Sequence, residues 1–274
     1  MLNYNLVDDN DLEILLNNVA DKYGYDFTEY SKASIIRRIN RLCTLDKFTS
    51  FAELHYKVLN DESYFGRFVE EITVNVTEMF RDRHFYKTLR EQIIPQLGVH
   101  SYIKIWLAGC STGEEAYSLS ILLNEANLAH KAIIYATDIN PSVLETAKYG
   151  IYPINLIRNY SENYINSGGT NNFSDYYTAN YDHVRFVDKL RERVIFATHN
   201  LVSDSSFNEF QLILCRNVLI YFDKNLQEKV LRLFDSSLES LGYLALGSKE
   251  TIKFSQLEGD YQQIEKEKIW RKVS

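Results

Sequence analysis

The sequence predicts an α/β protein in which a mostly parallel sheet carries helices on both faces, preceded by an all-helical segment. Up to about Glu71 the apolar residues recur at helical spacing, without the alternation typical of strands. From Ile103 onward, short apolar runs alternate with helical patterns. Because strands that are joined through helices pair in parallel by right-handed crossovers, the second part is expected to form one layered domain.

Three of the helices expected in the first quarter follow a residue that can cap their free N–H groups. We expect helices that start at Asn10–Asp11, at Thr28 or Ser31, and at Ser50, and a further helix over 62–75. No strand is expected in this part, so it should form a small helical domain.

In the second part, buried strands are expected over residues 103–108, 132–136, 194–196, 212–215 and 243–246. Helices are expected over 114–124, from an Asn140 cap with Pro141 at the first position, and from an Asp223 cap to Gly242. Between 152 and 193, two short alternating runs interrupt this order. They predict a small antiparallel insertion.

Composition and charge exclude several classes of protein. Of 274 residues, 45% are apolar and 24% are charged, as in ordinary globular domains. The apolar runs are far shorter than the roughly 18 residues of a membrane span, and no secretory signal pattern follows Met1. The three cysteines show no CxxC spacing, and a net charge of -7 disfavours a general nucleic-acid binder. We expect a cytoplasmic protein with no metal site, no nucleic-acid partner and no direct membrane insertion.

A glycine-containing turn, residues 109–113, joins the first predicted strand to its helix. Asp138 ends the next strand, where an acidic side chain can bind both ribose hydroxyls of a nucleoside. Glu114 and Glu115 follow the turn, where they would repel a phosphate and attract an ammonium or sulfonium group. This favours S-adenosylmethionine over NAD or ATP, and no P-loop motif is present. Alternatively, Ser111 and Glu114 form a capping box, which leaves both interpretations open.

Four motifs in the same order carry a family resemblance: NVTEMFRD at 75–82, GCSTGEEAYS at 109–118, TDI at 137–139 and CRNVLIYF at 215–222. Together they resemble the CheR family, chemotaxis methyltransferases that esterify glutamates on chemoreceptors with S-adenosylmethionine. The resemblance implies a helical N-terminal domain over 1–75 and a linker over 76–95 that reaches the cofactor pocket. It further implies a Rossmann-like S-adenosylmethionine-dependent methyltransferase domain over 96–274, with a small antiparallel β insertion at about 152–193.

The resemblance also assigns roles to individual residues. It implies that Arg81 and Tyr221 are catalytic. The implied cofactor-binding residues are Asn75, Thr77, Arg81, Gly109, Glu114, Asp138, Asn200, Leu201, Asn217 and Val218. Structural alternatives are that Arg81 pairs with Asp82 or Glu78 on a solvated helix face, that Tyr221 is an ordinary core aromatic, and that Asn217 is only a turn residue.

The chemistry that the family performs makes few demands on the protein. A glutamate, with an unperturbed pKa near about 4.3, is already an ionised nucleophile at neutral pH, so no general base is required. Positioning and a dry pocket would supply the catalysis. Arg81 would hold the substrate carboxylate near the methyl group, and the Tyr221 hydroxyl would orient it.

Two segments are candidates for recognition of the receptor. Arg37, Arg38 and Arg41 fall within a 100° arc of one helix, opposite an apolar arc, and suit an acidic partner such as the glutamate-bearing methylation helices of a chemoreceptor. A solvated charged face is the alternative. The β insertion, through the loop at Gly168–Gly169, is a candidate site for a C-terminal tether peptide of the receptor.

Three other functions compete with the methylation of chemoreceptors. A nucleic-acid methyltransferase is disfavoured because the three prolines form no Pro-Pro pair and no cysteine follows a proline. A non-catalytic, S-adenosylmethionine-sensing receptor-binding module is disfavoured by the presence of Arg81, Asp138, Asn217 and Tyr221. A carboxyl methyltransferase of another signalling protein cannot be separated from a chemotaxis enzyme by sequence.

Overall fold

The computed structural model describes residues 7–273, and the chain divides into two compact units. The first unit comprises the chain up to Asn75 together with Ile220–Lys229, and the second comprises Val76–Leu219 together with the chain from Val230 onward. The short segment 220–229, which follows the last of the four motifs, is therefore grouped with the helical N-terminal part.

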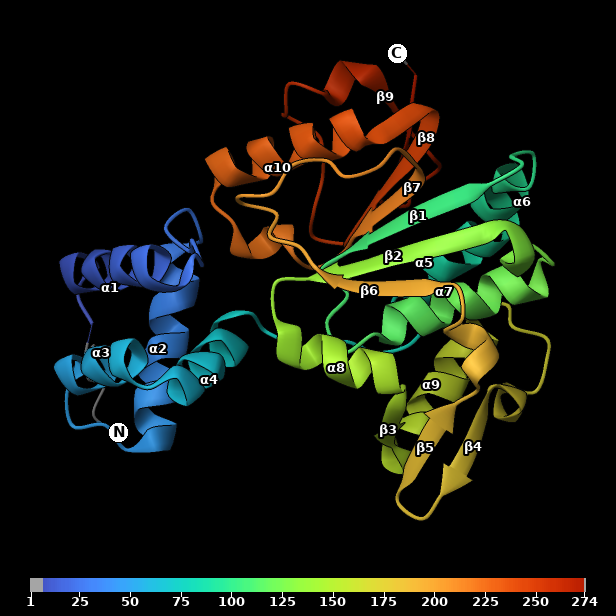
Figure 1. Cartoon of the computed structure of the whole chain (residues 1–274). Coiled ribbons are helices and arrows are strands. Elements are labelled where there is room, and N and C mark those ends of the chain that lie inside the picture. Colours follow the sequence, from blue (N-terminus) through green and yellow to red (C-terminus); the bar gives the residue numbers. More distant parts are fainter. Residues whose placement is uncertain (1–6, 274) are drawn as a thin grey trace. The chain divides into compact units, whose positions relative to one another are not determined.

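The first unit contains the helices that the apolar spacing predicts. They are α1 (Asp9–Tyr23), α2 (Lys32–Asp46), α3 (Phe51–Asn60) and α4 (Glu62–Ile72) (Figure 1). The Asp8 carboxylate caps α1 by accepting from the Asp11 amide at 2.8 Å, so this helix begins earlier than predicted. Ser50 caps α3 as predicted, whereas Ser31 precedes α2 without a side-chain cap bond. The fourth helix ends at Ile72 rather than at residue 75.

The second unit is built on a seven-stranded sheet in the order β6-β2-β1-β7-β8-β10-β9. Its strands are β1 (Ile103–Ala108), β2 (Ala132–Asp138), β6 (Val194–Thr198), β7 (Phe210–Cys215), β8 (Leu238–Leu246), β9 (Tyr261–Gln263) and β10 (Ile269–Lys272). Strands β6, β2, β1, β7 and β8 are parallel, and β10 and β9 complete the sheet antiparallel. The sequence pattern missed β9 and β10 because they are short and separated by polar residues.

Helices cover both faces of this sheet (Figure 1). They are α5 (Arg83–Thr88), α6 (Ile94–Leu97), α7 (Glu114–Glu125), α8 (Pro141–Tyr149) and α10 (Lys224–Ser237). On β1, Ile105 and Leu107 belong to the core that includes Leu119 of α7, while the alternate residue Trp106 packs edge-on against Phe234 of α10. Because successive side chains of a strand point to opposite faces, α7 and α10 lie on opposite faces of the sheet.

The predicted end of the last long helix is wrong, and the predicted linker contains regular structure. The residues 76–95, expected to be a linker, contain α5, a π-helical turn at Leu89–Ile93 and the start of α6, and Phe80 is fully buried. The last long helix ends at Ser237 and not at Gly242, since Leu238 pairs with Phe210 in the sheet. The Ser237 hydroxyl donates to the Leu233 carbonyl at 2.7 Å, which competes with continued helix formation.

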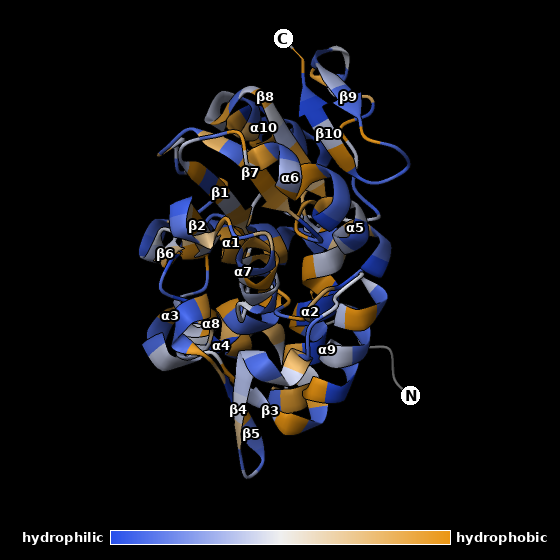
Figure 2. Cartoon of the chain, turned by 90° about the vertical axis from the view of Figure 1, so that its right-hand side faces the viewer, coloured by the Kyte–Doolittle hydropathy of each residue, from blue (hydrophilic) through white to orange (hydrophobic). Residues whose placement is uncertain are grey.

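The predicted insertion is present and is more elaborate than expected. It contains β3 (Ile151–Pro153), α9 (Ile154–Asn166), β4 (Tyr177–Asn180) and β5 (His183–Phe186), with an antiparallel sheet in the order β3-β5-β4. Gly168 and Gly169 follow α9 and lie outside the β4–β5 hairpin. Figure 2 shows this hairpin as pale to hydrophilic, in contrast to the hydrophobic central strands β1 and β7.

Candidate cofactor and catalytic site

The turn after β1 has a backbone that requires glycine at both ends. Gly109 has φ 78° and Gly113, the residue before α7, has φ 94°. A Cβ atom at Gly113 would also lie 2.7 Å from the Ala147 Cβ atom, and one at Gly109 would collide with the Val218 side chain. The amides of Gly109 and Cys110 donate to the Thr137 carbonyl at 2.8 and 2.9 Å, so the turn lies directly beside the end of β2.

Asp138, at the carboxyl end of β2, connects the end of its own strand to the turn that follows β1. Its side chain is buried, with 8% of the residue exposed. One carboxylate oxygen accepts from the Ser111 amide at 2.8 Å, and the other accepts from the Asn140 amide at 3.0 Å. Burial raises the pKa of this carboxyl group above its ordinary value. Since a carboxylate offers about four acceptor positions, Asp138 retains capacity for two hydroxyl donors.

Glu114 is a second buried carboxylate beside the same turn, with 4% of the residue exposed. It accepts from the Thr112 hydroxyl at 2.7 Å and from the Tyr160 hydroxyl at 3.2 Å, and burial raises its pKa. The capping-box alternative is wrong, because Gly113 is the cap of α7 and the Ser111 hydroxyl has no hydrogen-bond partner among the described residues. Within the described part of the chain, no lysine or arginine forms an ion pair with Glu114 or Asp138.

These residues fit a nucleoside that carries a cationic group. Besides the two carboxylates, the buried Ser111 hydroxyl and the buried Asn140 side-chain nitrogen have no partner in residues 7–273. Unpartnered buried polar atoms are costly, so such atoms beside this turn are typical of a ligand site. Asp138 and Glu114 are suited to accept hydrogen bonds from ribose hydroxyls and from an ammonium group, whereas they would repel phosphate.

The predicted residues after β6 and β7 lie at the same ends of the sheet. His199, next to Asn200, donates its amide to the Asp138 carbonyl at 3.1 Å. Asn200 itself accepts from the Val202 amide at 2.9 Å, which turns the chain at Leu201. Asn217 follows β7 with φ 61°, and its amide donates to the Glu250 carboxylate at 2.9 Å.

Of the N-terminal motif, residues from Val76 onward belong to the second unit. Phe80 anchors this segment, with its amide donating to the Ser118 hydroxyl of α7 at 3.0 Å. Arg81 and Thr77 are half-buried, and the Arg81 guanidinium reaches only the Val76 carbonyl at 3.3 Å. Asn75 belongs to the first unit, where its side chain contacts the Glu70 carbonyl at 3.4 Å.

The structural alternatives for Arg81 are wrong. Neither Glu78 nor Asp82 pairs with it: Glu78 accepts from Asn159 at 2.7 Å, and Asp82 pairs with Arg216 at 2.6 Å. Arg216, which sequence reasoning missed, is the buried partner that holds this motif. The available signal was its place in CRNVLIYF: an arginine directly after a fully buried strand must find counter-charges in the fold.

Tyr221 belongs to the first unit, although it follows the β7 motif in sequence. Its carbonyl accepts from the Ser31 amide at 2.8 Å, and the Asp223 amide donates to the Glu29 carbonyl at 3.0 Å. Phe222 is the buried aromatic here and contacts Tyr30, while Tyr221 is half-buried. Asp223 caps α10, as predicted, by accepting from the Leu226 amide at 2.9 Å.

The three arginines of α2 have different surroundings. Arg37 and Arg41 are exposed, and Arg41 pairs with Glu71 at 2.5 Å. Arg38 is half-buried; its guanidinium lies 5.7 Å from the centre of the Tyr221 ring and donates to the Glu71 carbonyl at 3.2 Å. Arg38 therefore does not share the open face that the helical wheel gave it, because Tyr221 and the end of α4 cover it.

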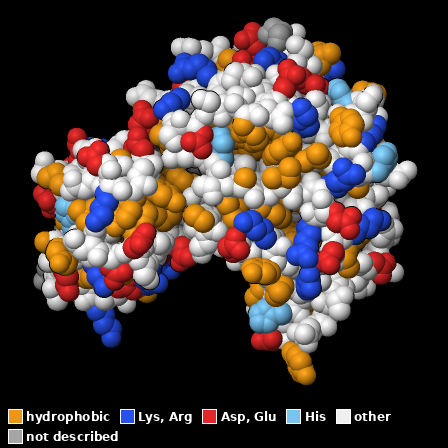
Figure 3. Space-filling model, viewed as in Figure 1, with side chains coloured by type: hydrophobic (Ala, Val, Ile, Leu, Met, Phe, Trp, Pro, Cys, Tyr) orange, Lys and Arg blue, Asp and Glu red, His pale blue; other side chains and the backbone are white. Residues whose placement is uncertain are grey.

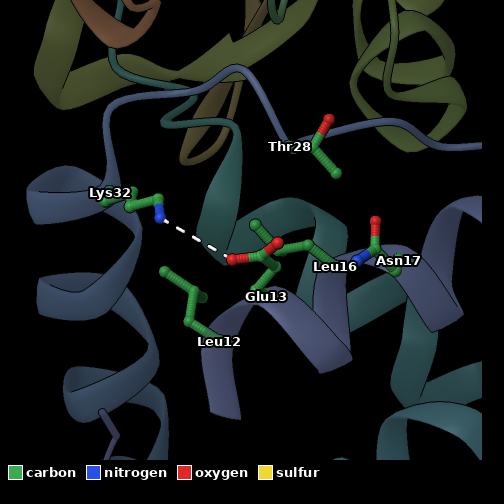
Figure 4. Close-up of a pocket in the computed structure, with 6 residues that line it drawn as sticks. All are labelled: Leu12, Glu13, Leu16, Asn17, Thr28 and Lys32. Carbon is green, nitrogen blue, oxygen red and sulfur yellow. Dashed lines mark ion pairs between the residues drawn. The ribbon is translucent and has the colours of Figure 1, made fainter. Parts of the chain in front are cut away.

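A small pocket lies elsewhere in the first unit (Figure 4). It measures about 160 Å³ and is lined by Leu12, Glu13, Leu16, Asn17, Thr28 and Lys32. Lys32 and Glu13 lie 4.0 Å apart across it, and both side chains are largely exposed. None of the predicted site residues lines this pocket. On the face shown in Figure 3, basic side chains are interspersed with acidic ones in each unit.

Two kinds of feature are absent from the described residues. None of the helices described is both long and apolar enough to cross a membrane. No group of three or more histidine, cysteine, aspartate or glutamate side chains in the described chain is arranged to hold a metal ion.

A mostly parallel sheet whose first turn presents two buried carboxylates, neither of them ion-paired with a lysine or arginine within residues 7–273, is typical of methyltransferases that use S-adenosylmethionine. The chain belongs to the CheR methyltransferase family. The model of the family's S-adenosylmethionine-binding domain matches residues 75–269, and the model of its all-alpha domain matches residues 10–73. These matches confirm the predicted family, fold class and cofactor.

Similar proteins carry names that agree with this family. "Putative methyltransferase Cher3" of Pseudomonas putida is 44% identical over 96% of this chain and 97% of that protein. A "Chemotaxis protein methyltransferase" of Borreliella burgdorferi is 32% identical over 92% of this chain and 91% of that protein. One of the same name from Listeria innocua is 31% identical over 84% of this chain and 85% of that protein.

Proposed function

We propose that this protein methylates glutamate side-chain carboxylates on chemoreceptors, giving glutamate methyl esters and S-adenosylhomocysteine for sensory adaptation. The observation that carries the proposal is the pair of buried carboxylates, Glu114 and Asp138, beside the turn of a CheR methyltransferase domain. The relatives, which are named chemotaxis protein methyltransferases, support a function in chemotaxis, and the resemblance to the CheR family points to chemoreceptors as the substrate.

The reaction requires positioning rather than proton transfer. S-adenosylmethionine supplies a methyl carbon bound to a positively charged sulfur. A glutamate carboxylate oxygen forms a bond to that carbon as the carbon–sulfur bond breaks, and the electron pair stays on sulfur. The products are a neutral ester and a neutral thioether, and no proton moves. A base would contribute nothing, since the glutamate is ionised at neutral pH.

The residues of this chain then have distinct tasks. Asp138 would accept from the ribose hydroxyls and Glu114 from the ammonium group, with Asn200, Leu201, Asn217 and Val218 completing the walls at the strand ends. Asn75, Thr77 and Arg81 would approach from the N-terminal motif. Arg81 would hold the substrate carboxylate, and this role is supported by a guanidinium that no carboxylate of the described chain neutralises.

Receptor docking is assigned to the exposed pair Arg37 and Arg41 on α2, with an acidic helix as the partner. Arg38, which belonged to the predicted docking set, contacts the Tyr221 ring. Its proposed role is to position that ring and not to dock the receptor. The β insertion stays a proposed site for a receptor tether peptide. The Gly168–Gly169 segment follows α9 and is not part of the β4–β5 hairpin. A peptide that pairs with an edge strand of the small sheet, β3 or β4, would therefore not contact these glycines in the hairpin.

The test is methyl transfer from radiolabelled S-adenosylmethionine to membranes that contain candidate chemoreceptors, with base-labile label as the sign of a carboxyl methyl ester. Arg81→Ala should lower turnover by about 10- to 100-fold, because a charge-assisted hydrogen bond is worth roughly 1.5–3 kcal/mol. Cofactor affinity should change much less. Arg83→Ala, an exposed neighbour on α5, is the matched control and should behave as wild type.

The other outcomes separate the alternatives. Equal activity of Arg81→Ala would contradict the role of Arg81. Binding of S-adenosylhomocysteine in calorimetry without labelling of any receptor would favour another methylated signalling protein or a sensing module. A protein that does not bind S-adenosylhomocysteine would contradict the assignment of the carboxylates.

A further inference from the structure

Arg216 is a fully buried arginine directly after β7, with its side chain 2% exposed. It contacts two segments that are distant from it in sequence, residues 81–86 and the start of α7. Its guanidinium lies 2.6 Å from the Asp82 carboxylate and 2.6 Å from the Glu115 carboxylate at the start of α7. It also stacks on the ring of Phe85, 3.9 Å from the ring centre, so the charge is enclosed on several sides.

The guanidinium bonds to the backbone of Arg81 as well. The nitrogen that pairs with Asp82 also donates to the Arg81 carbonyl at 3.3 Å. Arg216 thus holds the main chain of Arg81 and the side chain of its neighbour. The Arg81 side chain itself remains outside this cluster, where its guanidinium contacts only the Val76 carbonyl in the described chain.

The segment that Arg216 holds has an unusual backbone. Phe80 has φ 52° and Asp82 has φ 63°, so the residues on both sides of Arg81 are left-handed although neither is glycine. Such conformations persist only where the surroundings fix them. Here the Ser118 hydroxyl holds Phe80 from one side, and Arg216 holds Asp82 from the other. The direction in which the Arg81 side chain leaves the turn is therefore set by these two anchors.

Of the two ion pairs of Arg216, the one with Glu115 is largely buried, whereas the Asp82 side chain is 41% exposed. A buried ion pair such as Arg216–Glu115 is poorly explained by stability alone. The cost of removing two charges from water often exceeds their attraction, and apolar replacements of similar volume are frequently neutral or stabilising. Tyr86 adds a hydroxyl that donates to the same Glu115 oxygen at 3.1 Å, which completes the polar cluster. The cluster instead fixes the backbone conformation of the turn that carries Arg81.

We propose that Arg216 is a positioning residue for methyl transfer, which acts through Asp82 and the Arg81 carbonyl to aim the Arg81 guanidinium at the substrate carboxylate. This inference rests on the proposed role of Arg81. It predicts that loosening the turn slows the methyl-transfer step and leaves cofactor binding nearly intact, since Asp138 and Glu114 are not part of the cluster.

The test uses the full chain and a double-mutant cycle. Asp82→Asn keeps the shape of a side chain that tolerates positive φ but removes the charge that Arg216 meets. We expect kcat for receptor methylation to fall about tenfold, with the affinity for S-adenosylhomocysteine within about twofold of wild type. In an Arg81→Ala background, Asp82→Asn should cause no further loss, because the turn would then have no side chain to aim.

Glu145→Gln on α8 is the matched control. It removes the carboxylate from an exposed ion pair of the same unit, with Lys148, and should leave kcat unchanged. Arg216→Lys gives a second route to the same cycle, because lysine keeps the charge but not the planar fork. Arg216→Lys should lower kcat when Arg81 is present and should cause no further loss in the Arg81→Ala background.

Wild-type kcat in Asp82→Asn and Arg216→Lys would overturn the proposal. So would losses that add to that of Arg81→Ala, which would mean a general structural role. If Arg81→Ala itself has wild-type activity, the proposed role of Arg81 fails together with this inference. If Arg81→Ala is slow but Asp82→Asn and Arg216→Lys are not, only the inference fails.

Discussion

Replacement of Asp138 by asparagine is a sharp test of the cofactor site, because the change is isosteric and its consequences follow from two distances. The carboxylate accepts the Ser111 amide at 2.8 Å through one oxygen and the Asn140 amide at 3.0 Å through the other. In Asp138→Asn, one oxygen becomes an NH₂ group. Whichever way the new amide is oriented, one backbone N–H then faces a donor.

The magnitude follows from burial. A buried donor without a partner costs about 1–3 kcal/mol, which corresponds to a fall in Tm of roughly 2–12 °C for a domain of this size. Ligand affinity loses more, since the ribose hydroxyls would also exchange a charged acceptor for a neutral one. We expect the affinity for S-adenosylhomocysteine to fall by about 10- to 100-fold, at roughly 1.5–3 kcal/mol per charge-assisted bond.

Differential scanning fluorimetry and titration calorimetry measure the two effects on the same sample. Glu145→Gln, which removes only an exposed ion pair of the same unit, should melt and bind as wild type. A variant Asp138→Asn that melts and binds as wild type would refute the argument. A loss of stability without a loss of affinity would show that Asp138 fixes the turn but does not contact the ribose.

Two further predictions concern Glu114 and the arginines of α2. Burial raises the pKa of Glu114. The proposed bond to the ammonium group needs the ionised carboxylate. The affinity for S-adenosylhomocysteine should therefore fall as the pH is lowered from 7.5 through that raised pKa. Glu114→Gln should bind more weakly at pH 7.5 and show a flatter pH profile; an unchanged profile in calorimetry would contradict this role. Joint replacement of Arg37 and Arg41 by glutamate should raise KM for receptor membranes at nearly constant kcat, whereas Arg38→Gln should lower kcat because its guanidinium lies over the Tyr221 ring. If all these arginine variants changed KM alone, the separation of their tasks would be wrong.

Most regular elements of the fold were predictable because their signals are local. The apolar run of β1 and the helical spacing of α2 depend on residues within one or two turns of each other. The cap at Asn140, with Pro141 next to it, could likewise be read directly, and the structure has both. The end of α10 was not predictable, since Leu238 fits the helical stripe and only its pairing with Phe210 makes it a strand residue.

The site divides in the same way. The turn at 109–113 and the acid at the end of β2 follow from the order of strand, glycine turn, helix and strand, so the sequence alone predicted a nucleoside-type site and, through its motifs, the CheR family. The capping box at Ser111 and Glu114 also fitted the local sequence. It failed because Thr112 and Tyr160 offer Glu114 better partners, and Tyr160 comes from α9, which is distant in sequence.

The sequence by itself determined most of the elements and their order, because these depend on local periodicity and on residue type, and its motifs predicted the candidate site residues. Only the tertiary structure decided the partners. It paired Asp82 with Arg216 rather than with Arg81, and it grouped Tyr221 with the helical unit, over the Arg38 guanidinium. The physical reason is that a charge or a ring is satisfied by whatever the fold brings within a few ångströms, and that neighbour is seldom the nearest in sequence.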